Sequence, residues 1–177
     1  MAAVVAVAAQ ISVPLPFSPV PFTMGVLAVI LSGFVLGPRY GALALVVYLL
    51  IGAVGVPVFA QFTGGLGRLV GPTGGYLISY PLAAAIAGLA AGAFTSRDQG
   101  RGRIVASGTA FGLLGLLVIY ALGAAWLAVQ AGLSANEAIA AGILPFVPFD
   151  VIKVVLAALL AAAVAPQLSP IAARRAS

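Results

Sequence analysis

Cysteine and histidine are both absent from the 177 residues, and only three acidic side chains are present, Asp98, Glu137 and Asp150. Without cysteine the chain can form no disulfide, thiol nucleophile or thiolate metal site. Without histidine, and with so few carboxylates, it lacks the side chains of the usual metal clusters and acid–base pairs. The sequence therefore predicts a protein with no metal and no cofactor that is not an enzyme.

Charge is scarce as well. Only 6% of the residues are charged and 63% are hydrophobic, with a mean hydropathy of +1.24, whereas a typical soluble domain is about 25% charged. This composition predicts an all-α integral membrane protein. A bilayer core needs roughly 20 apolar residues per helical crossing, so the chain has room for about seven helices at most. Residues 1–177 are therefore expected to form a single domain.

The net charge of +5 does not indicate nucleic-acid binding. The basic residues are scattered in ones and twos among apolar runs, without the basic stripe that nucleic-acid interfaces use. The chain also has no G-x-x-x-x-G-K-[ST] motif, which predicts that it does not bind ATP through a P-loop.

Six apolar stretches are separated by clusters of proline, glycine and charge, and we expect them to form one bundle of six transmembrane helices. The first three are short for a full crossing. The first either begins further upstream or tilts into the end of the bundle, and the second and third could also be buried half-helices. The expected helices are Ala2 to Val13, Thr23 to Leu36, Tyr40 to Val54, Gly74 to Phe94, Ile104 to Ala131 and Asp150 to Val164.

The segment from Gly55 to Thr73 is rich in glycine and proline yet remains apolar, which is unusual for a solvated loop. Irregular backbone at membrane depth is tolerated only where it is buried in protein or lines a cavity. We therefore expect this glycine-rich segment to fold back onto the bundle.

The basic residues predict the orientation. Six crossings place both termini and the connections after the second and fourth helices on one side of the membrane. By the positive-inside rule that side is the cytoplasm, so the chain is expected to lie in the bacterial inner membrane. Six of the eight basic residues fall there, namely Arg39, Arg97, Arg101, Arg103, Arg174 and Arg175.

Arg68 and Lys153 lie instead in the outer half, and Asp150 is three residues before Lys153, on the same helix face. An ionisable group inside a membrane is costly and marks a candidate functional site. The alternative is that Asp150 and Lys153 only neutralise each other.

These charges define a ligand chemistry. A cationic side chain suits a carboxylate, and the Asp150 carboxylate accepts hydrogen bonds from paired N–H donors. We therefore predict a site for a small amphiphilic acid that carries N–H groups. Neighbouring aromatic residues could cover its apolar body, although each could also belong to the core or the interfacial belt; they are Phe17, Phe22, Phe59, Phe62, Tyr76, Phe146 and Phe149.

Three segments resemble the BioY family, the biotin-specific S components of energy-coupling-factor (ECF) transporters. The sequence GVPVFAQFTGGLGRLVGPTGGYLISYPLAA at 55–84 resembles the hallmark stretch of that family. The sequences VPLPFSPVPFT at 13–23 and GILPFVPFDVIKVVLA at 142–157 resemble its first outer loop and its last helix.

The resemblance implies biotin uptake by a high-affinity subunit with six helices and a pocket near the extracellular face. Asp150 would accept hydrogen bonds from the ureido N–H groups of biotin, and Lys153 would attract its valerate carboxylate. Gln61, Arg68 and Tyr76 are further candidates for substrate contact. Glycine and proline at 71, 72, 74 and 75 are expected to serve the backbone turn and close helix approach.

The resemblance also implies partners. Ala2 and Ala6, a small-xxx-small pair, would dock a transmembrane coupling subunit, and two ABC-type ATPase subunits would supply energy unless the chain acts alone as a facilitator. Three alternatives are an S component or facilitator for another vitamin, an intramembrane enzyme, and a structural or channel-forming protein. The lack of histidine and of paired membrane carboxylates argues against the enzyme.

Overall fold

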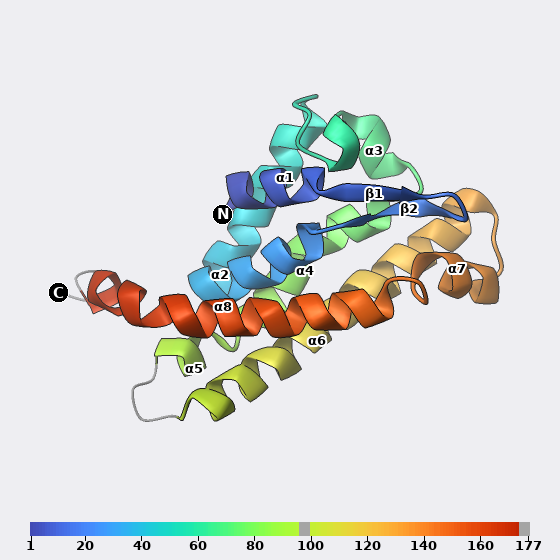
Figure 1. Ribbon diagram of the computed structural model, residues 1–177. Coiled ribbons are helices and arrows are strands. Elements are labelled where there is room, and N and C mark those ends of the chain that lie inside the picture. Colours follow the sequence, from blue (N-terminus) through green and yellow to red (C-terminus); the bar gives the residue numbers. More distant parts are fainter. Residues whose placement is uncertain (96–99, 174–177) are drawn as a thin grey trace.

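The computed structural model describes residues 1–95 and 100–173 and is mostly helical (Figure 1). Four of the residues considered above, Arg97, Asp98, Arg174 and Arg175, lie outside this range. The helices are α1 (Ala2–Gln10), α2 (Gly25–Ala53), α3 (Leu66–Val70), α4 (Gly74–Gly88), α5 (Ala91–Thr95), α6 (Arg101–Ala131), α7 (Ala135–Gly142) and α8 (Val147–Ala173), with a 3₁₀ turn η1 (Ala60–Phe62) and strands β1 (Ser12–Leu15) and β2 (Ser18–Thr23).

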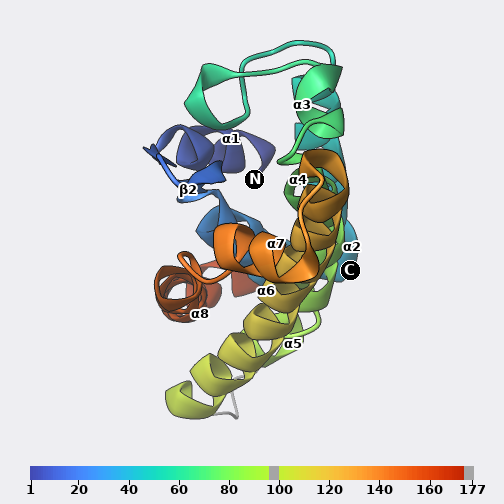
Figure 2. The ribbon, with the colours of Figure 1, turned by 90° about the vertical axis from the view of Figure 1, so that its right-hand side faces the viewer.

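The bundle is built on close contact between small residues. Helix α4 packs between α2 and α6, and α8 packs against both α2 and α6. Ala83, Ala84 and Ala87 of α4 are fully buried, which lets neighbouring backbones approach closely, as in other membrane bundles. Figure 2, seen nearly along α8, shows α1, the hairpin and α8 on one side of the molecule, with α6 running obliquely across it.

The outer surface of the bundle is apolar. Large hydrophobic side chains on its outside are widely exposed, for example Val54 at 80% and Val129 at 81%. Within the described residues, three helices are long and apolar enough to cross a membrane: α2, α6 and the 147–164 part of α8. Together with the composition, these features identify a multi-pass membrane protein.

Helix α2 is divided at Gly37, whose φ of 77° and ψ of 178° lie outside the helical region. Pro38 follows, and the chain turns sharply there (Figure 1). The two helical segments, 25–36 and 38–53, fold against each other: a Cβ added to Gly41 would lie 3.0 Å from the Gly33 Cα. They correspond closely to the second and third predicted helices. The count of six crossings stays a prediction.

Other predicted boundaries were wrong. The first helix ends at Gln10, and the proline-rich stretch after it forms an antiparallel β1–β2 hairpin in which Val13 pairs with Phe22. Proline is tolerated there because each strand of a two-stranded ribbon has an unpaired edge. The fourth helix ends at Gly88, where the Gly37–Pro38 turn packs so closely that an added Cβ would lie 2.5 Å from the Pro38 nitrogen; α5 then follows separately.

A capping box starts α7. Ser134 and Glu137 exchange hydrogen bonds between side chain and backbone, and the bonds from Ser134 hold the pKa of the exposed Glu137 below its usual value. Helix α7 contacts the hairpin, since the Ser18 hydroxyl donates to the Ala141 carbonyl at 2.7 Å. The hairpin is thereby fixed over one end of the bundle.

We expect the substitution Gly33→Ala to destabilise the bundle. A Cβ at Gly33 would collide with the Ala84 carbonyl oxygen and lie 2.8 Å from the Gly88 nitrogen, and overpacking of this kind costs about 1–3 kcal/mol. Thermal unfolding in detergent measures the effect. The control Gly102→Ala, where no heavy atom lies within 4 Å, should unfold no earlier than the unaltered chain; equal unfolding of both variants would contradict the packing described here.

Candidate functional site

A cavity lies between the hairpin, the glycine-rich segment and parts of α2, α4, α6 and α8. It offers about 230 Å³ to the centres of water-sized molecules, whereas one water needs only about 10–15 Å³. It is therefore large enough for a small organic molecule. Four tyrosines on the helices line it, Tyr48, Tyr76, Tyr80 and Tyr120, and Asp150 lines it from α8.

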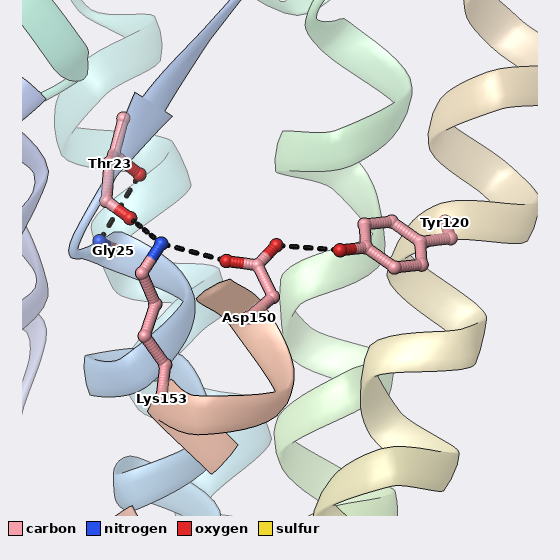
Figure 3. A network of polar contacts seen from close by, with 5 residues as sticks. All are labelled: Thr23, Gly25, Tyr120, Asp150 and Lys153. Atoms are coloured by element: carbon pink, nitrogen blue, oxygen red, sulfur yellow. Dashed lines mark hydrogen bonds and ion pairs between the residues drawn. The ribbon is translucent and has the colours of Figure 1, made fainter. Parts of the chain in front are cut away.

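Asp150 is held by a network that joins three elements (Figure 3). The residue is 4% exposed. The Lys153 Nζ donates to Oδ1 at 2.7 Å, and the Tyr120 hydroxyl of α6 donates to Oδ2 at 2.8 Å. An ionised carboxylate has about four acceptor positions, so Asp150 keeps acceptor capacity for a ligand while both of its oxygens are fixed.

Lys153 lies behind Asp150 and does not line the cavity. Its Nζ donates to Asp150 and also, at 2.6 Å, to the backbone carbonyl of Thr23, the last residue of β2. It also lies 3.7 Å from the centre of the Phe22 ring, a cation–π contact. The three N–H groups of the ammonium therefore have partners within the protein, and Lys153 acts on the cavity through Asp150.

Arg68 is the basic side chain of the described residues that lines the cavity. It lies on the short helix α3 and is exposed. Within residues 1–95 and 100–173 it makes no ion pair or side-chain hydrogen bond. An unpaired guanidinium at a cavity can bind a carboxylate through two parallel N–H donors.

Gln61 also lines the cavity, from an unusual backbone conformation. Its φ is 61° and that of Phe62 is 54°, in the left-handed region that non-glycine residues rarely adopt. Gln10 of α1 holds this turn: its Nε2 donates to the carbonyls of Val58 and Phe59, both at 3.2 Å, and its Oε1 accepts from the Phe62 backbone N–H at 2.8 Å. Strained backbone at a candidate site is consistent with a functional role.

Trp126 of α6 anchors the other end of the glycine-rich segment by donating to the Gly71 carbonyl at 2.9 Å. A Cβ at Gly75 would collide with Trp126, and one at Gly74 with the Leu69 carbonyl. The prediction that Gly74 and Gly75 permit close approach is confirmed.

The predicted aromatic residues divide into three groups. Phe59, Phe146 and Tyr76 line the cavity, and the Tyr76 hydroxyl donates to the Gly142 carbonyl at 2.9 Å. Phe22 and Phe149 pack edge to face at 5.4 Å, beside Lys153. Phe17 and Phe62 are 64% and 73% exposed and lie outside the cavity lining.

Sequence reasoning missed Gln10, Tyr48, Tyr80 and Tyr120. A signal was available for the tyrosines, because a phenolic hydroxyl in an apolar helix needs a hydrogen-bond partner when buried. The signal for Gln10 was weaker, because it is only a single polar residue at the end of an apolar run. The Asp150 partner of Tyr120 and the Val58, Phe59 and Phe62 partners of Gln10 lie 30 or more residues away, so spacing along the sequence could not reveal them.

Ala2 and Ala6 of α1 are partly buried and pack against the hydrophobic core. The exposed side of α1 carries Ala3, Val4 and Val7. The predicted docking pair therefore lies at the edge of the exposed surface of α1, with part of each side chain still accessible.

Comparison with known proteins gives matches to one family that cover most of the chain. The family model described as "BioY family" matches residues 1–170. The "Probable biotin transporter BioY" of Pyrococcus horikoshii is 45% identical over 90% of this chain and 88% of its own. The "Biotin transporter BioY" of Thermotoga maritima is 48% identical over the same shares.

A solved structure has the same fold. It is the S-component for biotin from an ECF-type ABC transporter, with a TM-score of 0.80 and 24% identity, covering 92% of this chain and 85% of that one. The predicted S-component fold agrees with this likeness.

We expect the substitution Lys153→Met to destabilise the protein more than the double substitution Asp150→Leu with Lys153→Met. The single change leaves a buried carboxylate without its cation, which costs about 3–5 kcal/mol, whereas replacing both charges by apolar groups is often neutral. Thermal unfolding in detergent compares the two variants. If the single variant is as stable as the unaltered chain, the ion pair does not hold this end of the bundle together.

Proposed function

The chain belongs to the BioY family, and from this membership we propose that it captures biotin in the cavity beside Asp150 as the substrate-binding subunit of an uptake system. The named relatives are biotin transporters. The observation that carries the proposal is the buried Asp150 carboxylate, which lines the cavity with both oxygens held in place.

Biotin has the chemistry that the cavity requires. Its ureido ring offers two N–H donors to the Asp150 carboxylate, and charge-assisted hydrogen bonds of this kind are the stronger ones. Its apolar body would lie among side chains such as Tyr80, Ile119 and Phe146. Its carboxylate would pair with Arg68, which lines the same cavity and has no partner among the described residues.

This assignment changes the role proposed for Lys153. The resemblance implied that Lys153 attracts the biotin carboxylate, but its ammonium is already bound to Asp150, Thr23 and the Phe22 ring. We propose instead that Lys153 orients the Asp150 carboxylate, and that Arg68 binds the biotin carboxylate. Gln61 and Tyr76 remain proposed contacts because both line the cavity.

We propose that the chain crosses the bacterial inner membrane six times with both termini in the cytoplasm. The division of α2 at Gly37 supports six crossings. Arg39 follows that division, and Arg101 and Arg103 begin α6. These parts of α2 and α6 lie at the end of the bundle that is opposite to the hairpin, α3 and α7 (Figure 1). With the basic end inside, the cavity would face the extracellular side.

The partners we propose are a transmembrane coupling subunit, docked near Ala2 and Ala6, and two ABC-type ATPase subunits. The resemblance to S components supports this assembly, as does the lack of a P-loop motif in the chain. The second candidate function is capture of another small vitamin by the same cavity.

Calorimetry on the detergent-purified protein tests the proposed ligand. We expect biotin to bind, and thiamine and riboflavin not to bind, because neither presents paired ureido N–H groups together with a carboxylate. Tight binding of either of those vitamins, with none of biotin, would overturn the assignment.

Substitution of Arg68 tests the proposed orientation. Arg68→Gln should weaken biotin binding at least about tenfold, since a hydrogen bond to a charged group contributes about 1.5–3 kcal/mol. The control Arg103→Gln removes an exposed charge roughly 25 Å along α6 from Tyr120 and should leave affinity unchanged. Equal affinities for all three proteins would show that Arg68 does not hold the ligand.

A larger side chain on α1 tests whether biotin binding and biotin transport depend on different surfaces of the protein. We expect Ala6→Leu to leave biotin affinity unchanged, because Ala6 does not line the cavity, and to reduce biotin uptake by cells that contain the partner subunits. Uptake of labelled biotin is the measurement. Unchanged uptake would contradict docking at this face.

A further inference from the structure

A second, more open pocket adjoins the first cavity. It has a volume of about 420 Å³ and is lined by Pro19, Gly64, Gly67, Arg68, Gly71, Pro72 and Thr73. Pro19, Arg68 and Thr73 line both cavities. These three residues therefore mark the boundary between the two.

The boundary lies at one end of the candidate site. Arg68 belongs to both linings, whereas Asp150 belongs only to the first. On the proposed function, the ureido ring lies against Asp150 and the carboxyl group of the ligand lies against Arg68. A group attached to that carboxyl group would therefore point into the second cavity.

Gly67 contributes no side chain to the lining of this pocket, although the packing of the fold does not require glycine at this position. A Cβ at Gly67 would meet no heavy atom within 4 Å, and its φ is not in the left-handed region. By contrast, a Cβ at Gly64 would collide with the Val56 carbonyl. Gly67 lies within α3, where glycine is less favourable than alanine by roughly 0.5–1 kcal/mol. Local structure thus gives no reason for glycine at this position.

We propose that the second cavity is a subsite for the amine part of biotin amides, so that the protein captures both free biotin and biotin joined through its carboxyl group to a small amine such as the side chain of lysine. The proposal rests on the proposed function. The exposed Arg68 guanidinium has five N–H donors and serves both ligands. It binds the carboxylate of free biotin, or the amide carbonyl and the amino-acid carboxylate of biotinyl-lysine.

The test is calorimetry with two probes, biotin and Nε-biotinyl-lysine, on the full chain in detergent. The unaltered protein should bind both. Gly67→Leu should keep its affinity for biotin and lose at least about tenfold for biotinyl-lysine, since groups that compete for limited space in a pocket discriminate at this level. Gly67→Ala should show a smaller loss in the same direction.

The matched control is Gly102→Leu, another helical position where an added Cβ meets nothing within 4 Å, and both affinities should be unchanged there. The proposal is overturned if the unaltered protein binds biotin but not biotinyl-lysine. It is also overturned if Gly67→Leu weakens both ligands equally, or weakens neither. Failure to bind biotin at all would instead overturn the proposed function itself.

Discussion

The burial of one ion pair in an apolar bundle constrains the rest of this structure. Asp150 and Lys153 are each 4% exposed, and a buried charge is tolerated only if its partners are supplied by the protein. Those partners come from far along the chain: the Tyr120 hydroxyl from α6 and the Thr23 carbonyl from the end of β2. The pair therefore fixes the position of α8 against both α6 and the hairpin, and these are the elements that enclose the cavity.

The same constraint gives the cavity its polarity. Lys153 satisfies one oxygen of Asp150 from behind, so the carboxylate faces the cavity as an acceptor whose charge is balanced inside the protein. Arg68, at the other end, is exposed and without a partner among the described residues. A ligand with N–H donors at one end and a carboxyl group at the other matches this arrangement. The outer surface of the bundle, in contrast, exposes large apolar side chains such as Val54 and Val129.

The sequence predicted the parts of this architecture that depend on composition and local order. Scarcity of charge indicated a membrane bundle, and Gly37 and Pro38 separated two helical stretches. The charges of Asp150 and Arg68 pointed to the region where a candidate cavity lies, and their role in ligand binding stays a prediction. The hairpin was missed because its prolines were interpreted only as helix breakers, whereas a two-stranded ribbon tolerates them. The true position of Lys153 could not be predicted, since whether an ammonium faces a cavity or a backbone carbonyl 130 residues away depends on tertiary packing. Gln10 and Tyr120 were missed for the same reason.

The central claim is that Asp150 receives the N–H groups of the ligand and Arg68 its carboxyl group. An experimental structure of the protein with biotin bound tests it most directly. We expect the ureido ring within hydrogen-bonding distance of the Asp150 carboxylate and the valerate carboxylate beside the Arg68 guanidinium. A reversed ligand, with its carboxylate against Lys153 and its ureido ring beside Arg68, would show that both assignments are wrong.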